Sequence, residues 1–177
     1  GVEPRDLKTL NVLLDALRRR CKVSDFGLSK SESLNTTATQ STMGGGGAKG
    51  TPSYMAPELL EDNLFDEKSD VYSFAIVMWE IWDGGVPWHG LKPVQITRKV
   101  VDKRERPPPP EGAPDDLVAL MQRCWDHEPD ARPTFAAITA ELHILDQNAH
   151  QQESLDEIKE MLAAKNSKLL GRALALQ

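Results

Sequence analysis

The stretch "RDLKTLNVLLDALRRRCKVSDFG", residues 5 to 27, decides how the rest of the chain is interpreted. Its polar first part brings together a carboxylate, an ammonium group and an amide, on Asp6, Lys8 and Asn11. Two short β segments follow, around residues 12–14 and 22–24, and a basic turn joins them. The sequence therefore predicts a small β-hairpin that directly follows a polar, chemistry-bearing loop.

The segment after this hairpin changes character twice. Residues 28–50 contain few apolar side chains and many Ser, Thr and Gly residues, which predicts a mobile loop. Residues 71–82, "VYSFAIVMWEIW", are apolar on all sides and predict a buried helix. We expect Ser69 to cap the N-terminus of this helix and Gly84 to end it.

The C-terminal half has helical periodicity interrupted by prolines. Residues 104–114, "RERPPPPEGAP", cannot continue a helix and predict an extended connector. In the tail, Ser154 and Glu157 have the spacing of a capping box that would start one amphipathic helix. Apolar residues at helical spacing form two faces after the connector and one in the tail: Leu117, Leu120, Met121, Cys124 and Trp125; Phe135, Ile138, Leu142 and Leu145, capped by Thr134; and Leu155, Ile158 and Leu162.

Composition limits the function classes. The 177 residues are 40% hydrophobic and 27% charged, which suits one cored domain. The net charge of −6 argues against a general nucleic-acid or membrane-surface binder. The longest apolar run is shorter than a membrane span and contains Glu80. Two distant cysteines, Cys21 and Cys124, favour a reducing compartment, and we expect a cytoplasmic protein.

The order of several motifs resembles the eukaryotic protein kinases. "RDLKTLN" at 5–11, "DFG" at 25–27 and "GTPSYMAPE" at 50–58 resemble the catalytic loop, the metal-binding motif and the end of the activation segment. "SDVYSFAIVMWE" at 69–80 and "CWDHEPDARPTF" at 124–135 resemble the central helix and the closing segment. In detail, the motifs look most like the tyrosine-kinase-like branch, whose members mainly phosphorylate serine and threonine.

The resemblance implies an α+β fold class and a domain organisation. Residues 1–145 would form the mostly helical C-terminal lobe of the kinase domain, with a small β-hairpin near the N-terminus. The catalytic loop would occupy 4–11 and the activation segment 25–58, and residues 146–177 would form a helical tail. A Gly-rich loop, a strand lysine and its partner glutamate do not appear in the sequence. The N-terminal lobe is therefore expected to be absent, and the chain to be a truncated catalytic domain that is inactive alone.

The resemblance also implies roles for individual residues in phosphoryl transfer from ATP with Mg²⁺. Asp6 would orient the substrate hydroxyl and accept its proton, and Lys8 would offer an ammonium group to the γ-phosphate. Thr51 would link Asp6 and Lys8, a combination that favours Ser/Thr substrates. The residues that would bind the cofactors are Asn11 and Asp25, as oxygen ligands of the metal, together with Lys8 and with Leu13 as an apolar floor under the adenine.

Other matches are structural or regulatory. Glu58 and Arg132 resemble a buried ion pair, and Asp70 resembles a residue that holds the catalytic loop from below. Arg5 could receive a phosphate group on the activation segment, added by an upstream activating kinase. The candidate phosphorylation sites are Ser29, Ser31, Ser33, Thr36, Thr37, Thr39, Ser41 and Thr42.

Two functions from different classes stay open at this point. The first is a protein serine/threonine kinase in signal transduction, with a protein substrate, no nucleic acid and no membrane span. The second is a catalytically dead, pseudokinase-like interaction module. Pro4 motivates the second, because it stands where the family almost always has histidine. The oligomeric state cannot be predicted from the sequence.

Overall fold

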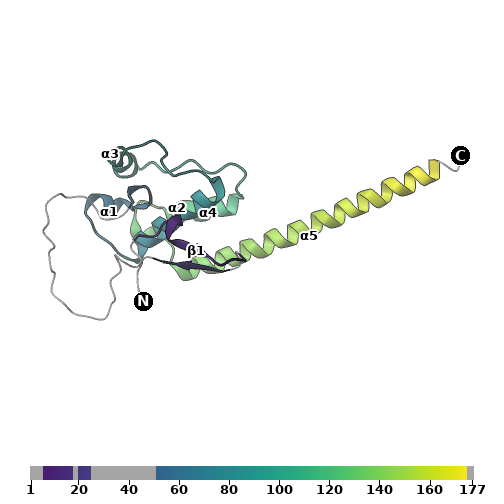
Figure 1. Cartoon of the computed structure of the whole chain (residues 1–177), viewed down its shortest axis with the longest axis horizontal. Helices are drawn as coiled ribbons and strands as arrows, with labels where there is room; N and C mark the ends of the chain where they lie inside the picture. Colours follow the sequence, from purple (N-terminus) through teal and green to yellow (C-terminus); the bar gives the residue numbers. More distant parts are fainter. Residues whose placement is uncertain (1–5, 18–19, 25–50, 175–177) are drawn as a thin grey trace. The chain divides into compact units, whose positions relative to one another are not determined.

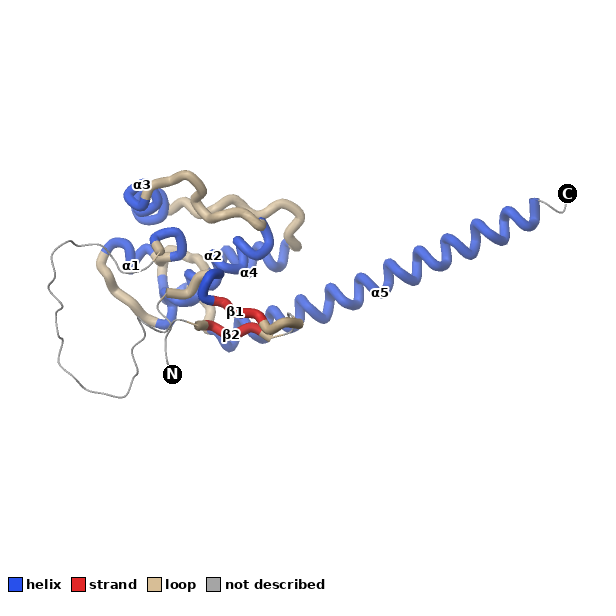
Figure 2. The backbone as a smooth tube through the Cα atoms, viewed as in Figure 1, coloured by secondary structure: helices blue, strands red, loops and turns tan. Residues whose placement is uncertain are grey.

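The computed structural model describes residues 6–17, 20–24 and 51–174, with side chains up to residue 163. The chain divides into two units, residues 1–135 and 136–177, which are considered separately. The elements are η1 (Thr9–Asn11), β1 (Val12–Leu14), β2 (Cys21–Val23), η2 (Pro52–Tyr54), α1 (Pro57–Glu61), α2 (Glu67–Asp83), α3 (Pro93–Thr97), η3 (Arg98–Asp102), α4 (Asp115–Cys124), η4 (Pro129–Ala131) and α5 (Phe135–Leu174) (Figure 1). The described part is mostly helical with one two-stranded sheet, as the fold-class prediction requires (Figure 2).

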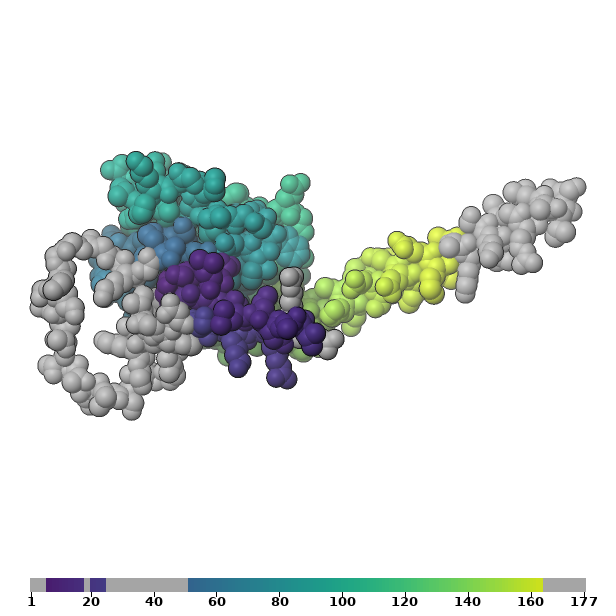
Figure 3. Space-filling model, in the orientation of Figure 1, coloured from purple at the N-terminus to yellow at the C-terminus, as the bar shows by residue number. Residues whose placement is uncertain are grey.

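The hairpin after the polar loop is confirmed. Strands β1 and β2 are antiparallel, and Leu13 lies opposite Lys22 at the centre of the register. The second strand begins at Cys21, one position earlier than expected. A two-stranded hairpin is marginally stable by itself. Further backbone bonds extend this one, because the amide of Ser24 donates to the carbonyl of Asn11 (2.7 Å). Figure 3 shows this N-terminal segment, in purple, against blue and teal residues of the same unit.

Helix α2 is the buried centre of the first unit. Val71, Tyr72, Ala75 and Ile76 on this helix have no exposed surface, in agreement with the sequence prediction. Burial does not continue to the C-terminal end, because the last turn exposes Ile81 (70%). The expectation of burial on every face therefore holds for most of the helix and fails in its last turn.

The ends of α2 correct one prediction and confirm another. The N-cap is Asp66, and the predicted cap, Ser69, is the third residue of the helix. The two residues form a reciprocal capping box, in which each side chain binds the backbone N–H of the other. At the other end Gly84 has φ = 72°, the left-handed conformation that commonly ends a helix.

The proline-rich connector and α4 also follow the prediction. Residues 104–114 contain no helix or strand. The connector is attached to the rest of the unit by the indole Nε1–H of Trp79, which donates to the carbonyl of Pro108 (2.6 Å), and by Arg106, whose Nε donates to the carbonyl of Trp125 (2.8 Å). In α4 the predicted apolar face is buried at Leu120, Met121 and Cys124.

The described part of the second unit is helix α5 from Ala136 onward, since Phe135, the first residue of this helix, is counted in the first unit. This helix begins at Phe135, directly after the predicted cap Thr134, and runs without a break to Leu174. The predicted helix start at Ser154 is wrong. The Ser154 hydroxyl donates to the carbonyl of His150 (3.0 Å), a bond that forms inside a continuing helix. The proposed boundary between residues 145 and 146 therefore lies inside α5 and stays a prediction.

Along α5 the described apolar side chains of the tail, among them Leu155 and Ile158, are about half exposed. Within the described residues, α2 and α5 included, no helix combines the length and the apolar composition needed to cross a membrane.

Candidate active site

The polar loop that precedes β1 brings the predicted catalytic residues together. The Lys8 ammonium group lies 2.6 Å from a carboxylate oxygen of Asp6 and donates a second hydrogen bond to the Thr51 hydroxyl (3.2 Å). Both charged side chains are partly buried, with exposed fractions of 19% for Lys8 and 14% for Asp6. Lys8 therefore connects the loop to a segment more than forty residues away in the sequence.

Asn11 completes the loop at the end of η1. Its backbone N–H donates to the carbonyl of Lys8 (3.0 Å), which closes the short helical turn. Its side-chain Nδ2 donates to the backbone carbonyl of Asp6 (2.7 Å), so the nitrogen of the amide is oriented towards Asp6. The amide oxygen is not occupied by these bonds and can act as a hard-oxygen ligand.

The two remaining predicted cofactor residues have different outcomes. Leu13 lies on β1 and is 57% exposed, which leaves apolar surface on the hairpin just after Asn11. Asp25 lies outside the described residues, although its neighbour Ser24 is bonded through both N–H and hydroxyl to the carbonyl of Asn11. Among the described residues, no group of three or more His, Cys, Asp or Glu side chains could hold a metal ion.

A second polar network near the loop was missed by the sequence analysis. The Glu80 carboxylate on α2 accepts two hydrogen bonds at one oxygen, from the hydroxyls of Thr9 (2.8 Å) and Tyr54 (2.5 Å). Burial, followed by the hydrogen bond to Glu80, raises the pKa of Tyr54 to about 12. The one signal in the sequence was the presence of Glu80 in an otherwise apolar run. The network attaches the polar loop and the segment after Thr51 to the same helix.

The predicted buried ion pair is present. Two guanidinium nitrogens of Arg132 each donate to a different carboxylate oxygen of Glu58, both at 2.8 Å. The Arg132 side chain is fully buried, and Glu58 also accepts a bond from the Ser69 hydroxyl (2.8 Å). Burial raises the pKa of Glu58, but the hydrogen bonds and positive charge of Arg132 outweigh it, so that this pKa lies below its ordinary value.

Arg132 also joins other parts of the first unit. Its guanidinium group donates to the backbone carbonyls of Lys68, Asp126 and His127, and the Lys68 ammonium group in turn bonds the carbonyl of Arg132. The group lies 5.3 Å from the ring centre of Tyr72, and Arg106 lies 5.1 Å from the same ring. The segment around Glu58 is thus attached to α2 and to the segment before η4.

Several regulatory expectations fall outside the described residues. Pro4, Arg5 and all eight candidate phosphorylation sites belong to this group. Asp70 is described and is 3% exposed, but the loop backbone that we expect it to hold, at residues 4–5, is not. These assignments stay predictions.

The described residues place an Asp–Lys–Asn loop before a β-hairpin and a buried Glu–Arg pair beside the segment after Thr51, which is the arrangement that the motif resemblance implied. Residues 4–142 match the family model described as protein tyrosine and serine/threonine kinase. The chain therefore belongs to the protein kinase family, as the motif resemblance indicated.

Individual relatives agree with this assignment. A probable serine/threonine-protein kinase of Dictyostelium discoideum is 44% identical over 138 residues, which is 78% of this chain and 14% of that protein. The serine/threonine/tyrosine-protein kinase HT1 of Arabidopsis thaliana is 41% identical over 147 residues, 83% of this chain and 36% of HT1. The serine/threonine-protein kinase CTR1 of the same plant is 40% identical over 134 residues, 76% of this chain and 16% of CTR1. The chain thus spans between 14% and 36% of the length of these relatives.

Proposed function

We propose that this chain carries the catalytic loop of a protein serine/threonine kinase, which transfers the γ-phosphate of ATP to protein hydroxyls. The observation that carries the proposal is the pair of contacts made by the Lys8 ammonium group, to Asp6 and to Thr51. Phosphoryl transfer depends mainly on positioning and on neutralising phosphate charge. A carboxylate and an ammonium group held side by side are suited to both tasks.

In this mechanism Asp6 orients the substrate hydroxyl and takes its proton, because an ionised carboxylate accepts a hydrogen bond from an alcohol. Lys8 stabilises the negative charge of the transferred group, and Thr51 holds Lys8 in place from the platform side. ATP with Mg²⁺ supplies the phosphoryl group. The Asn11 amide oxygen suits a magnesium ligand, since its Nδ2 is directed to Asp6. Asp25 would be the second ligand, and Leu13 would contact the adenine.

Membership of the kinase family supports the wider role that we propose. Relatives named serine/threonine kinases and dual-specificity kinases both occur among the matches, so both substrate classes need to be measured. We favour Ser/Thr substrates because of the Lys8 and Thr51 pair. A protein substrate, an upstream activating kinase, a cytoplasmic location and a role in signal transduction are part of the same proposal.

The test measures peptide phosphorylation by the longest natural protein that contains this sequence. Replacing Asp6→Asn should lower kcat by about 10²–10⁴-fold, the usual contribution of a positioned proton acceptor. Affinity for ATP should change little. Asp62→Asn is the matched control, because Asp62 is an exposed carboxylate at the end of α1. Equal activity of Asp6→Asn and Asp62→Asn would exclude the assigned role of Asp6.

The second candidate is a pseudokinase-like interaction module, and Pro4 is the observation that favours it. Proline fixes the backbone and removes the ring expected at that position. If Pro4 is a defect, Pro4→His should raise phosphorylation in the same assay. The interaction module would be supported by three results together. The natural protein would be inactive, its Pro4→His variant would also be inactive, and neither protein would bind Mg²⁺-ATP.

A further inference from the structure

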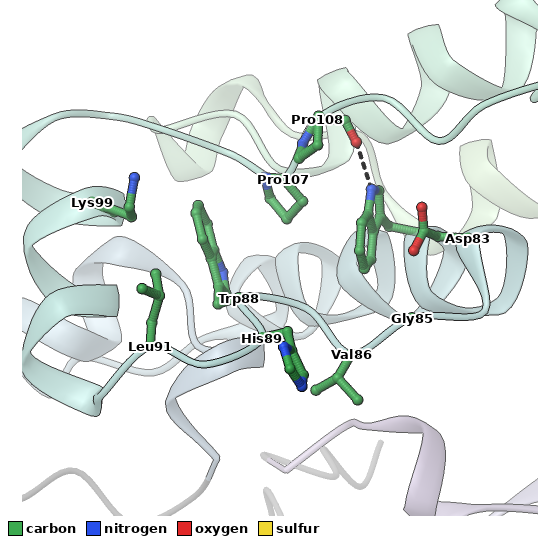
Figure 4. Close-up of a pocket in the computed structure, with 10 residues that line it drawn as sticks. Asp83, Gly85, Val86, Trp88, His89, Leu91, Lys99, Pro107 and Pro108 are labelled. Atoms are coloured by element: carbon green, nitrogen blue, oxygen red, sulfur yellow. Dashed lines mark hydrogen bonds between the residues drawn. The ribbon is translucent and has the colours of Figure 1, made fainter.

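A pocket of about 580 Å³ lies on the first unit, and no residue of the polar loop is among those that line it (Figure 4). It opens where the end of α2 meets the loop after Gly84, the π-helical turn η3 and the proline connector. Its apolar lining consists of Trp79, Val86, Trp88, Leu91, Pro107 and Pro108. The pocket is therefore built by segments that only the folded chain brings together.

One wall of the pocket is rigid. Trp79 is 6% exposed, and its indole N–H is already bound to the Pro108 carbonyl, drawn as the dashed line in Figure 4. Proline residues have little conformational freedom to lose. A ligand entering the pocket would meet a preformed surface, which lowers the entropic cost of binding.

The opposite wall contains a strained residue. Trp88 has φ = 61°, a left-handed conformation that is unusual for a bulky side chain. Its indole nitrogen is buried and has no hydrogen-bond partner among the described residues. Both features are locally unfavourable, and such features concentrate at functional positions. Val86, which is 60% exposed, forms part of the open rim.

The segment beside the pocket, residues 92–106, is basic in an acidic chain. Residues 92–106 carry six basic and two acidic side chains, although the whole chain has a net charge of −6. Lys99 lines the pocket, with its ammonium group 6.0 Å from the centre of the Trp88 ring. Lys99 and Lys103 share a single carboxylate, Glu105, so this group keeps a net positive charge. The pocket lining itself holds one carboxylate, Asp83, besides Lys99, so the excess of positive charge lies in the flanking segment and favours acidic residues of a partner there.

We propose that this pocket binds an acidic peptide segment of a partner protein, with one large apolar side chain as the anchor. The anchor would fill the space between the two indole side chains, which are Trp79 and Trp88. The flanking carboxylates would face the basic segment 92–106. Apolar anchors in preformed pockets with charged surroundings are the usual arrangement of energetically dominant interface residues. This surface does not depend on the proposed kinase activity, and its test requires neither ATP nor a substrate.

The experiment measures fluorescence anisotropy of labelled peptides with the full chain. The probes are a Glu-rich peptide with one central Phe, the same peptide with Ala at the centre, and a Lys-rich peptide with the central Phe. Val86→Asp places a charge on the pocket rim, and Leu64→Asp is its matched control because Leu64 is 61% exposed in another loop. Lys103→Gln removes a positive charge beside the pocket, and Lys159→Gln is its matched control. The two lysine side chains are 65% and 68% exposed, and each lies beside a carboxylate.

The Glu-rich Phe peptide should bind saturably, and the other two peptides should bind at least about tenfold more weakly. Val86→Asp should weaken binding about tenfold, whereas Leu64→Asp should not. Lys103→Gln should reduce binding and its salt dependence, and Lys159→Gln should leave both unchanged. The proposal is overturned if the Glu-rich Phe peptide does not bind, if the Lys-rich peptide binds equally well, or if Val86→Asp behaves like Leu64→Asp.

Discussion

The substitution Glu58→Gln tests whether the buried ion pair with Arg132 holds the end of the activation segment. The glutamine side chain has nearly the same size, so it removes the negative charge without leaving a cavity. The fully buried guanidinium group of Arg132 would then lack a counter-charge. Its bonds to three backbone carbonyls would remain.

Breaking a buried pair by removing one partner costs about 3–5 kcal/mol. We expect the free energy of unfolding to fall by about 3 kcal/mol, at the lower end of this range. The glutamine oxygen can still accept one hydrogen bond, and the Glu58 side chain is 16% exposed. Urea denaturation, followed by tryptophan fluorescence and far-UV circular dichroism, gives the free energy of unfolding. Asp156→Asn is the control, because the exposed pair between Asp156 and Lys159 should contribute nothing measurable.

The pH dependence provides an independent check on the same pair. The folded-state pKa of Glu58 lies below its ordinary value of 4.5. The carboxylate therefore stabilises the fold above pH 4.5, and this contribution disappears as the pH falls through the lower folded-state pKa. The difference in unfolding free energy between the native protein and Glu58→Gln should shrink in the same range.

Two results would refute this reasoning. One is a decrease in the free energy of unfolding of less than about 1 kcal/mol for Glu58→Gln, because the Glu58–Arg132 pair would then contribute no more than an ordinary surface ion pair. The other is a difference in stability that does not change between neutral pH and acid. The double variant Glu58→Gln/Arg132→Met should recover part of the loss, because it removes the uncompensated charge as well.

Three further predictions concern α2 and the polar network. Burial raises the pKa of both tyrosines of the chain, Tyr54 and Tyr72, to about 12. Ultraviolet titration should therefore show no tyrosinate near pH 10, as long as circular dichroism shows that the protein is still folded. The free energy of unfolding should fall as the pH rises from 10 towards 12, because the unfolded chain loses these protons first. Tyr72→Phe should leave the free energy of unfolding unchanged, since the buried hydroxyl has no partner among the described residues. Tyr72→Leu should lower the free energy of unfolding by about 2 kcal/mol, because the ring contacts with two guanidinium groups are lost. Gly84→Ala should cost about 1 kcal/mol through its left-handed φ alone, because no atom lies within 4 Å of the added Cβ; Gly84→Asn should cost less, and equal stabilities would contradict the assignment.

The fold was predictable where local signals were strong. The hairpin, the apolar core of α2, its stop at Gly84 and the proline connector all follow from period and residue type. The N-cap was misplaced because Asp66 and Ser69 are both capping residues, and a reciprocal box contains one at each end. The continuity of α5 through Ser154 was missed because a capping pattern marks a helix start only when the preceding residues are not helical.

The candidate site was predictable only through the family motifs. Periodicity cannot show that Lys8 contacts Thr51, since 43 positions separate them in the sequence. The network of Thr9, Tyr54 and Glu80 was missed for the same reason, because Glu80 lies 71 positions from Thr9 and 26 from Tyr54. A single acidic residue in a buried helix was the available clue, and its partners could be found only in the folded structure.

That single acidic residue has a dynamic consequence. One oxygen of Glu80 serves two hydroxyl groups, so the loop bearing Asp6 and the platform bearing Tyr54 should not fluctuate independently of each other. Amide hydrogen exchange should show the two segments opening together, in one cooperative step. The Lys8–Thr51 bond joins the same two segments, so removing the Glu80 carboxylate should weaken their coupling without separating them completely.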